Sequence, residues 1–198
     1  RQELDPGRMF VVPDVMWGIF EVLLVGTEPG DRVVINPPVY APFFETIAHA
    51  RRRLVEVPLV RDPAGVYGLD LAGLEEAFAA GVRAYLLCSP HNPVGRVWTR
   101  AELEAVATLA DRYGVLVLVD EIHGPLVHRP HRHVPFATLD APAAAEAISF
   151  VSASKAWNLA GLKCALAVAG SARGAALLAG MGEEVAYGAG LFGAVANT

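Results

Sequence analysis

The sequence predicts an α/β fold of three layers, αβα, in which helices cover both faces of a mostly parallel sheet. Along the 198 residues, short runs of β-branched and other apolar residues alternate with helical patterns, which is typical of α/β proteins. Several runs, such as residues 84–88, are apolar without interruption, and this indicates strands buried on both faces. A content of 54% hydrophobic and 19% charged residues is sufficient for one domain with a large core.

Strands and helices are expected in alternation along the chain. Apolar β-formers cluster at residues 32–36, 54–60, 84–88, 115–119, 147–151 and 164–169, which we predict to be strands. Helical spacing predicts helices at residues 14–25, 42–50, 71–80, 100–113 and 173–182. The helix at 100–113 has the clearest boundaries, because Thr99 and Glu102 form a Thr-x-x-Glu capping box and Gly114 is suited to end it.

Composition narrows the classes of partner. The net charge is −5, and arginines and lysines are scattered, so we expect no nucleic-acid partner. The run at 51–53 is three arginines, which we expect to be a solvated helix end. The longest uncharged tract, 185–198, is too short to span a membrane. The cysteines, Cys88 and Cys164, lie in apolar surroundings and favour buried free thiols, which suits a cytoplasmic location.

Neither end of the sequence has the pattern expected at the end of a domain. The chain begins almost directly on the apolar segment at 9–12, with no preceding element to cover it. It stops within an Ala/Gly/Val pattern that contains no stop signal. We therefore expect the sequence to be a fragment of a longer polypeptide.

Polar side chains follow three of the expected strands. The strand at 84–88 is followed by Asn92, the strand at 115–119 by Asp120 and His123, and the strand at 147–151 by Ser154 and Lys155. Ligands of open α/β sheets bind outside the carboxyl ends of the strands. Because parallel strands have these ends at one edge, we expect an amide, a carboxylate and a lysine to converge there.

This set of groups is what a pyridoxal 5'-phosphate site requires. A lysine must bind the aldehyde, and a carboxylate must keep the pyridine nitrogen protonated so that the ring accepts electrons. A donor holds the 3-oxygen, an aromatic side chain stacks on the ring, and hydroxyls, backbone N–H groups and a cation hold the phosphate. Lys155, Asp120, Asn92 and Tyr40 match the first four requirements.

The chain resembles the large domain of fold-type-I pyridoxal-phosphate enzymes, the class I/II aminotransferase superfamily. Within it, the chain is most similar to the cystathionine β-lyase (C–S lyase) branch. The resemblance is carried by residues 37–40, 90–98, 120–123, 152–155 and 158–163, in the family's order. It implies that residues 1–198 are a cofactor-binding large domain without its N-terminal segment and its C-terminal small domain.

The resemblance also implies roles around the cofactor ring. Lys155 is the Schiff-base lysine and the proton shuttle, and Asp120 pairs with the pyridinium. Asn92 bonds the 3-oxygen, and His123 stands near that oxygen, where aminotransferases often carry tyrosine. Tyr40 stacks on the ring. Lys155, Asp120 and Tyr40 are the expected catalytic residues.

Five further positions are implied for the phosphate. Ser152, Ser154 and Lys163 would hold it with their side chains, and Asp14 and Val15 with their backbone N–H groups. The sequence departs from the family at two of them, since many relatives carry arginine in place of Lys163 and Gly, Ser or Thr near Asp14. Lysine contacts a phosphate only as a point charge. Asp14 fits beside a phosphate if its side chain turns away to cap the helix.

Each position also has a plain structural explanation. Asn92 stands in a good turn sequence, Tyr40 and His123 can be packing residues, Ser152 can be a cap, and Lys163 can be an ordinary strand-edge lysine. A lone lysine after a strand is usually a surface charge. The combination, more than any single residue, favours the cofactor site.

We therefore expect a pyridoxal-phosphate-dependent β-lyase that cleaves cystathionine or a related S-substituted cysteine to thiol, pyruvate and ammonia. An aminotransferase on the same scaffold is the first alternative, and a truncated domain that binds the cofactor without turnover is the second. The resemblance implies an amino-acid substrate and a homodimer. No arginine for the substrate carboxylate is apparent in the chain.

Two patterns are set aside. Residues 188–193 match the dinucleotide-binding fingerprint by letter, but they follow no expected strand and precede no acidic partner. His128, His131 and His133 stand in a proline-broken, arginine-rich loop without carboxylates or thiolates at ligand spacing. We expect no metal site.

Overall fold

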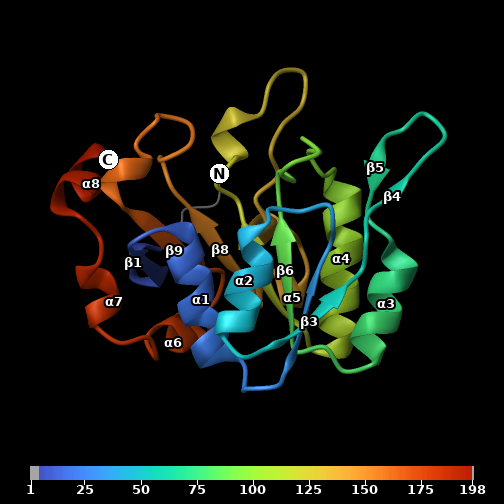
Figure 1. The fold of residues 1–198 in the computed structure, drawn as a ribbon, viewed down its shortest axis with the longest axis horizontal. Coiled ribbons are helices and arrows are strands. Elements are labelled where there is room, and N and C mark those ends of the chain that lie inside the picture. Colours follow the sequence, from blue (N-terminus) through green and yellow to red (C-terminus); the bar gives the residue numbers. More distant parts are fainter. Residues whose placement is uncertain (1–4, 198) are drawn as a thin grey trace.

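The computed structural model of the protein describes residues 5–197 and has a central sheet of seven strands in the order β1-β9-β8-β7-β6-β2-β3 (Figure 1). Its strands are β1 (Met9–Val12), β2 (Arg32–Ile35), β3 (Arg53–Glu56), β6 (Ala84–Cys88), β7 (Leu116–Asp120), β8 (Ile148–Val151) and β9 (Ala165–Ala169). A separate hairpin consists of β4 (Val60–Arg61) and β5 (Tyr67–Gly68). The predicted α/β class is confirmed.

Strand direction decides what meets at the carboxyl edge of the sheet. Strands β3, β2, β6, β7 and β8 are parallel, whereas β9 is antiparallel to both of its neighbours, β8 and β1. Strand β9 therefore starts at the edge where β8 and β1 end. All five residues of β6 are buried, which agrees with its unbroken apolar sequence. Segments that follow β1, β2, β6, β7 and β8, and the segment before β9, share this edge.

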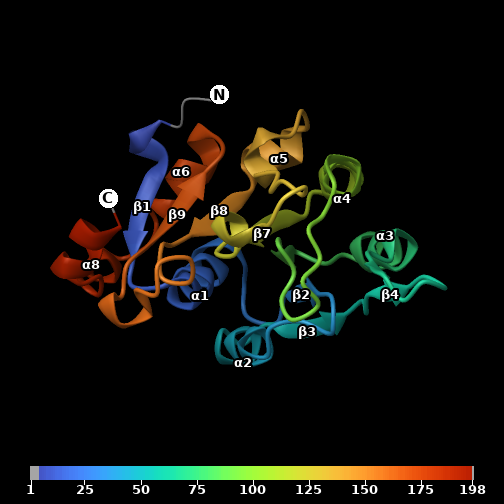
Figure 2. The ribbon, with the colours of Figure 1, turned by 90° about the horizontal axis from the view of Figure 1, so that it is seen from above.

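Helices cover both faces of the sheet, as predicted. They are α1 (Val15–Gly26), α2 (Pro42–His49), α3 (Leu71–Ala79), α4 (Arg100–Tyr113), α5 (Pro142–Glu146), α6 (Ala172–Leu178), α7 (Glu184–Tyr187) and α8 (Leu191–Ala196). Seen from above, α1 and α2 lie on one face and α3, α4 and α5 on the other (Figure 2). Each side has its own core, with Ile19, Phe43 and Phe150 on the first and Phe78 and Trp98 on the second.

Capping chemistry fixes the best-predicted helix. Helix α4 has the predicted bounds, the capping box of Thr99 and Glu102 is formed, and Gly114 adopts the left-handed conformation at φ 65°. The predicted helix at 173–182 is shorter in the structure, where α6 ends at Leu178. Gly180 and Gly182 follow, and glycine disfavours continuation of a helix.

The predicted strand at 54–60 is wrong in its second half. Strand β3 ends at Glu56, and Val60 pairs with Gly68 in the hairpin instead. Pro58 has no N–H group to donate to a neighbouring strand. The main chain still follows the end of β2, because the Leu59 N–H donates to the Pro37 carbonyl at 2.7 Å.

The prediction of a solvated arginine run at 51–53 is wrong for Arg52. Arg51 and Arg53 are exposed, but Arg52 is only 7% exposed. Its guanidinium donates to Thr27 Oγ1 at 2.7 Å and to the Leu23 carbonyl at 2.8 Å. The Thr27 hydroxyl also donates to the Leu23 carbonyl, so Arg52 adds to the partners of groups at the carboxyl end of α1, where carbonyls lack backbone donors of the helix.

Other expectations concern thiols and segments at the surface. Cys88 and Cys164 are buried free thiols, as predicted. Within residues 5–197, no helix is both long and apolar enough to cross a bilayer.

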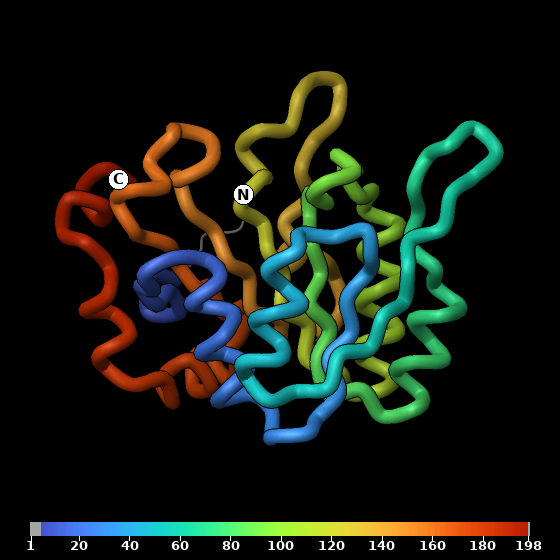
Figure 3. Tube along the Cα trace, viewed as in Figure 1, coloured from blue at the N-terminus to red at the C-terminus, as the bar shows by residue number. Residues whose placement is uncertain are grey.

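The segment after β7 carries a short 3-10 turn, Gly124–Leu126, and rises with the segment after β8 above the carboxyl edge of the sheet (Figure 3).

Candidate functional site

A cavity of about 400 Å³ opens at the carboxyl edge, and the ten predicted site residues all line it. They are Asp14, Val15, Tyr40, Asn92, Asp120, His123, Ser152, Ser154, Lys155 and Lys163. The sequence did not predict the rest of the wall, which consists of Met16, Cys88, Ile122, Ala160 and Cys164. Of the ten predicted residues, nine thus stand at or after the ends of five strands, and Lys163 precedes β9.

Asp120 lies at the floor of the cavity. It ends β7, stands opposite Cys88 of β6 and is 5% exposed. Its Oδ1 accepts a hydrogen bond from the Ile122 N–H at 3.1 Å, and no group within residues 5–197 donates to Oδ2. Burial raises the pKa of Asp120 to about 6, although the Ile122 amide and Lys155 act in the opposite direction. A buried carboxylate with one open oxygen favours a ligand that brings a proton or a positive charge.

Lys155 lies in the turn after β8 and is exposed to the cavity. No acceptor for its ammonium is found in the described part of the chain. Its positive charge helps to lower the pKa of Asp120, and it adds to burial in lowering the pKa of His123. The amine therefore interacts electrostatically with both side chains, and among residues 5–197 it has no competing partner.

Asn92 stands in a tight turn after β6. Its N–H donates to Cys88 Sγ at 3.3 Å, and the His91 N–H donates to the Arg96 carbonyl at 2.8 Å. No group of residues 5–197 bonds the side-chain amide of Asn92, so the amide is available to a ligand. The turn and the proposed ligand role are thus compatible.

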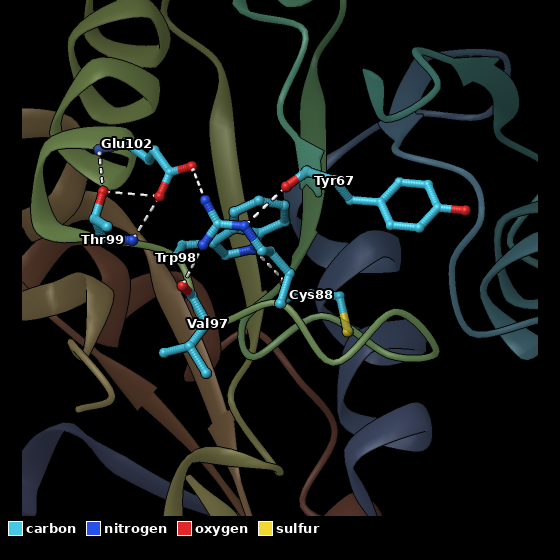
Figure 4. Close-up of polar contacts among 7 residues, drawn as sticks. Tyr67, Cys88, Val97, Trp98, Thr99 and Glu102 are labelled. Atoms are coloured by element: carbon cyan, nitrogen blue, oxygen red, sulfur yellow. Dashed lines mark hydrogen bonds and ion pairs between the residues drawn. The ribbon is translucent and has the colours of Figure 1, made fainter. Parts of the chain in front are cut away.

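Arg96 anchors this turn, and the sequence did not predict it. Its guanidinium donates to the Tyr67 carbonyl at 2.8 Å and to Glu102 Oε1 at 2.6 Å, and it lies 5.1 Å from the centre of the Trp98 ring (Figure 4). Trp98 Nε1 in turn donates to the Cys88 carbonyl at 2.9 Å. The turn is thereby fixed to the start of α4. The only sequence signal is the position of an arginine within the motif at 90–98.

Tyr40 follows β2 and also lines the cavity. Its ring meets Phe43 edge-on, with centroids 5.9 Å apart and an interplanar angle of 86°. His91 Nε2 donates to the Pro38 carbonyl at 3.0 Å, which joins the turn of Asn92 to the segment of Tyr40. The aromatic ring and the amide are therefore held by one connected piece of structure.

The two serines differ in their contacts. The Ser152 hydroxyl donates to the Cys164 carbonyl at 2.7 Å and accepts from the Ser154 N–H at 3.2 Å. It therefore links the exit of β8 to the start of β9. Ser154 Oγ lies 3.1 Å from Ser152 Oγ and has no other side-chain partner within residues 5–197. Its hydroxyl is the more available of the two for an anion.

Asp14 and Lys163 form an ion pair at the mouth of the cavity. Asp14 Oδ1 caps α1 by accepting from the Trp17 N–H at 2.8 Å, which is the orientation that the sequence required. Its Oδ2 also accepts from Lys163 Nζ at 2.8 Å, a contact that the sequence did not predict. Burial alone raises the pKa of Asp14, but hydrogen bonds from Lys163 and Trp17 outweigh it and keep the pKa below its ordinary value.

These features define a class of protein: an α/β domain whose carboxyl-edge cavity presents an amine, a buried carboxylate, an amide and a cationic mouth. Residues 3–197 match the sequence profile of the family described as aminotransferase class I and II. The chain belongs to this family. Within residues 5–197 no cluster of His, Cys, Asp and Glu suited to a metal ion is found.

Similar proteins include lyases and aminotransferases. A Mycobacterium leprae protein named "Putative cystathionine beta-lyase" is 47% identical over 99% of this chain and 49% of its own length. The structure of cystalysin from Treponema denticola, which contains a pyridoxal 5'-phosphate cofactor, is 29% identical with a TM-score of 0.89 and covers 98% of this chain and 50% of that chain.

N-succinyldiaminopimelate aminotransferase from Mycobacterium tuberculosis is also similar, with 34% identity and a TM-score of 0.82 over 90% of this chain and 45% of that chain. The chain thus spans about half the length of the proteins that it matches. The structures of cystalysin and of N-succinyldiaminopimelate aminotransferase are both similar to this chain in fold.

Proposed function

We propose that this chain binds pyridoxal 5'-phosphate and is the cofactor-binding large domain of a C–S β-lyase. The reaction is the cleavage of cystathionine, or of a related S-substituted cysteine, to thiol, pyruvate and ammonia. The observation that carries the proposal is the single cavity in which Lys155, Asp120 and Asn92 meet from the ends of three strands. The 47% identical relative named for cystathionine β-lyase and the cofactor of cystalysin support it.

The residues present fit this cofactor. The open oxygen of Asp120 suits a protonated ring nitrogen, and the unpartnered amine of Lys155 suits an aldehyde. The cationic mouth, where Lys163 lies beside the first turn of α1, suits a phosphate. All three groups line one cavity, as a single molecule with these three features requires.

The proposed roles follow from these positions. Lys155 holds the aldehyde carbon, and Asp120 keeps a proton at the ring nitrogen. Asn92 donates from Nδ2 to the 3-oxygen, with His123 beside it, and the ring of Tyr40 stacks on the cofactor. Because His91 and Arg96 fix the turn of Asn92, these two act as positioning residues.

The proposed phosphate site lies at the mouth. Ser154 donates its hydroxyl, which in the structure contacts only Ser152 Oγ among the side chains of residues 5–197, Ser152 shapes the turn, and Lys163 supplies a positive charge. The backbone N–H groups of Asp14 and Val15 at the start of α1 complete the site, since a helix N-terminus favours anions.

The reaction requires proton movement at the substrate Cα. When bound, pyridoxal phosphate supplies an electron sink for the negative charge that develops there. Once the substrate amine has replaced it at the aldehyde carbon, the freed Lys155 Nζ would take the Cα proton, and the carboxylate of Asp120 would maintain the positive charge of the ring. The thiol is then lost from Cβ. Lys155 is the general base and Asp120 the electrostatic partner.

We propose that residues 1–198 form only the cofactor half of a whole active site. The relatives are about twice as long, and among residues 5–197 no arginine lines the cavity to receive a substrate carboxylate. We propose that this arginine belongs to a C-terminal small domain of the whole protein. The whole protein would also contain an N-terminal segment and would act as a homodimer.

Cofactor binding tests the first part of the proposal. Addition of pyridoxal 5'-phosphate should produce an absorbance band near the visible edge, and Lys155→Ala should abolish it. Lys163→Ala should retain the band at higher cofactor concentration, because it leaves the amine in place. A band of equal strength in Lys155→Ala contradicts the assignment of the lysine.

Turnover by the whole protein tests the reaction. Stoichiometric release of thiol and pyruvate from cystathionine is expected of the lyase. Transfer of the amino group to a 2-oxo acid without thiol release would instead support an aminotransferase, which the similar structure from Mycobacterium tuberculosis favours. Cofactor binding without either reaction would support a non-catalytic domain.

A further inference from the structure

The ion pair of Asp14 and Lys163 places a carboxylate of the protein at the mouth of the cavity. Lys163 Nζ and Asp14 Oδ2 are 2.8 Å apart, and both residues line the same cavity as Lys155. Lys163, the lysine at the mouth, therefore donates to an acceptor that belongs to the protein, the Asp14 carboxylate. The consequence of this contact for cofactor binding rests on the proposed role of Lys163 in holding the cofactor phosphate.

The backbone fixes where Lys163 stands. Its φ of +46° lies in the left-handed region, which a side chain with Cβ rarely adopts. Its carbonyl accepts from the Gly190 N–H at 2.9 Å, and it immediately precedes Cys164 and the antiparallel strand β9. The side chain, by contrast, is 58% exposed, so it is free to exchange one acceptor for another.

Asp14 is held as an anion in the same place. Its side chain is 39% exposed and makes two bonds, one to the Trp17 N–H and one to Lys163. The net effect of burial and of these bonds is a lowered pKa, so the carboxylate is charged at neutral pH. The first turn of α1 favours that negative charge. A phosphate that enters the mouth therefore meets a fixed negative charge whose counter-ion is the lysine that it needs.

We propose that the Asp14 carboxylate competes with the cofactor phosphate for Lys163, so that Asp14 weakens the binding of pyridoxal phosphate. Two effects act in the same direction. The phosphate must take Lys163 from Asp14, and it must then lie near an uncompensated carboxylate. Asp14 thus holds the mouth lysine in place before the cofactor arrives and accelerates cofactor release afterwards.

Asp14→Asn is the sharpest variant, because asparagine caps a helix about as well as aspartate but carries no charge. The variant should bind pyridoxal 5'-phosphate about fivefold more tightly than the unaltered chain, as expected for an exposed ion pair. Its affinity for pyridoxal, which has no phosphate, should not change. Both affinities are read from the absorbance band that depends on Lys155, and the dissociation rate is read from its decay on dilution.

Asp70→Asn is the matched control. Asp70 caps α3 by accepting from the Gly73 N–H at 3.0 Å, and it does not line the cavity. This variant makes the same chemical change at the same kind of position, and it should leave both affinities as they are. Urea unfolding of both variants shows whether the helix caps survive.

Three results would overturn the inference. Equal or weaker binding of pyridoxal 5'-phosphate by Asp14→Asn would mean that Asp14 helps the phosphate by orienting Lys163. An equal gain for pyridoxal would mean that the effect does not act through the phosphate. Absence of any Lys155-dependent band in the unaltered chain would contradict the proposed function itself, and the inference with it. A normal band without a gain in affinity for pyridoxal 5'-phosphate in Asp14→Asn would contradict the inference alone.

Discussion

Two aspartates of one cavity have opposite electrostatic properties. Asp120 at the floor is 5% exposed, and burial raises its pKa to about 6. Asp14 at the mouth has a side chain that is 39% exposed, and its bonds to Lys163 and Trp17 outweigh burial, so that its pKa is lowered. The carboxylate of Asp120 is open to a ligand at the floor of the cavity, whereas the carboxylate of Asp14 is already neutralised at the mouth. The difference shows that environment, rather than residue type, separates the two roles.

The contrast between the two aspartates follows from the positions of β7 and β1 in the sheet. Asp120 ends β7, which lies between β6 and β8 at the centre of the sheet. Asp14 follows β1, an edge strand, and starts a helix. A central strand end is enclosed on both sides, whereas an edge strand end leaves room for solvent and for a long lysine side chain.

The largest expected effect is at the floor. Asp120→Asn in the whole protein should lower pyruvate release from cystathionine by at least about a hundredfold, because an amide cannot maintain the proton at the ring nitrogen. Asp111→Asn, an exposed change on α4, should leave the rate unaltered. If Asp120→Asn retained a rate within about twofold of the unaltered protein, the ring-nitrogen role would be wrong.

The raised pKa of Asp120 predicts a pH-dependent stability of the cofactor-free chain. The folded state binds this proton more tightly than the unfolded state, whose pKa is near 3.8. The resulting stabilisation is present below about pH 4 and is lost as the pH rises through about 6 to about pH 7. At about 1.4 kcal/mol per pKa unit, the free energy of unfolding should fall by about 3 kcal/mol at this site. Urea unfolding of the unaltered chain and of Asp120→Asn at both ends of this range measures it.

The asparagine variant should lack this component of the pH dependence. The stability difference between the two proteins should therefore change across the range. A difference that stays constant from about pH 4 to about pH 7 would show that Asp120 does not titrate there.

The smallest effect distinguishes the two serines of the mouth. Ser152→Ala removes the bond to the Cys164 carbonyl and should lower the free energy of unfolding by about 1 kcal/mol. Ser154→Ala should leave stability nearly unchanged and weaken the affinity for pyridoxal 5'-phosphate a few-fold, an effect of about 1 kcal/mol. Unfolding curves and absorbance titrations of both variants measure the two quantities. The reverse pattern would mean that Ser152 is the phosphate ligand and Ser154 the structural residue.

Much of the site could be predicted because its residues stand in a regular relation to the strands. Asn92, Asp120 and Lys155 each follow a recognisable apolar run, and parallel strands have their carboxyl ends at one edge. The direction of β9 was not predictable, since its apolar run reads the same in either direction. That direction places Lys163 at the same edge as Asp14.

Contacts between distant segments were also beyond the sequence. Arg96 reaches Tyr67 and Glu102, and Arg52 reaches Thr27, from positions where an exposed arginine was equally plausible. The length of an arginine side chain allows many partners. Which of them it meets depends on the packing of whole helices and strands.

The sequence by itself determined the α/β class, the capped helix α4 and the set of chemical groups at the strand ends. The spacing of apolar residues, the capping residues and the apolar runs depend only on residues that are close together in the sequence. The tertiary structure alone decided which carboxylate is buried and which is paired. Burial and ion pairing are sums over residues as far apart as Asp14 and Lys163, so only the folded chain defines them.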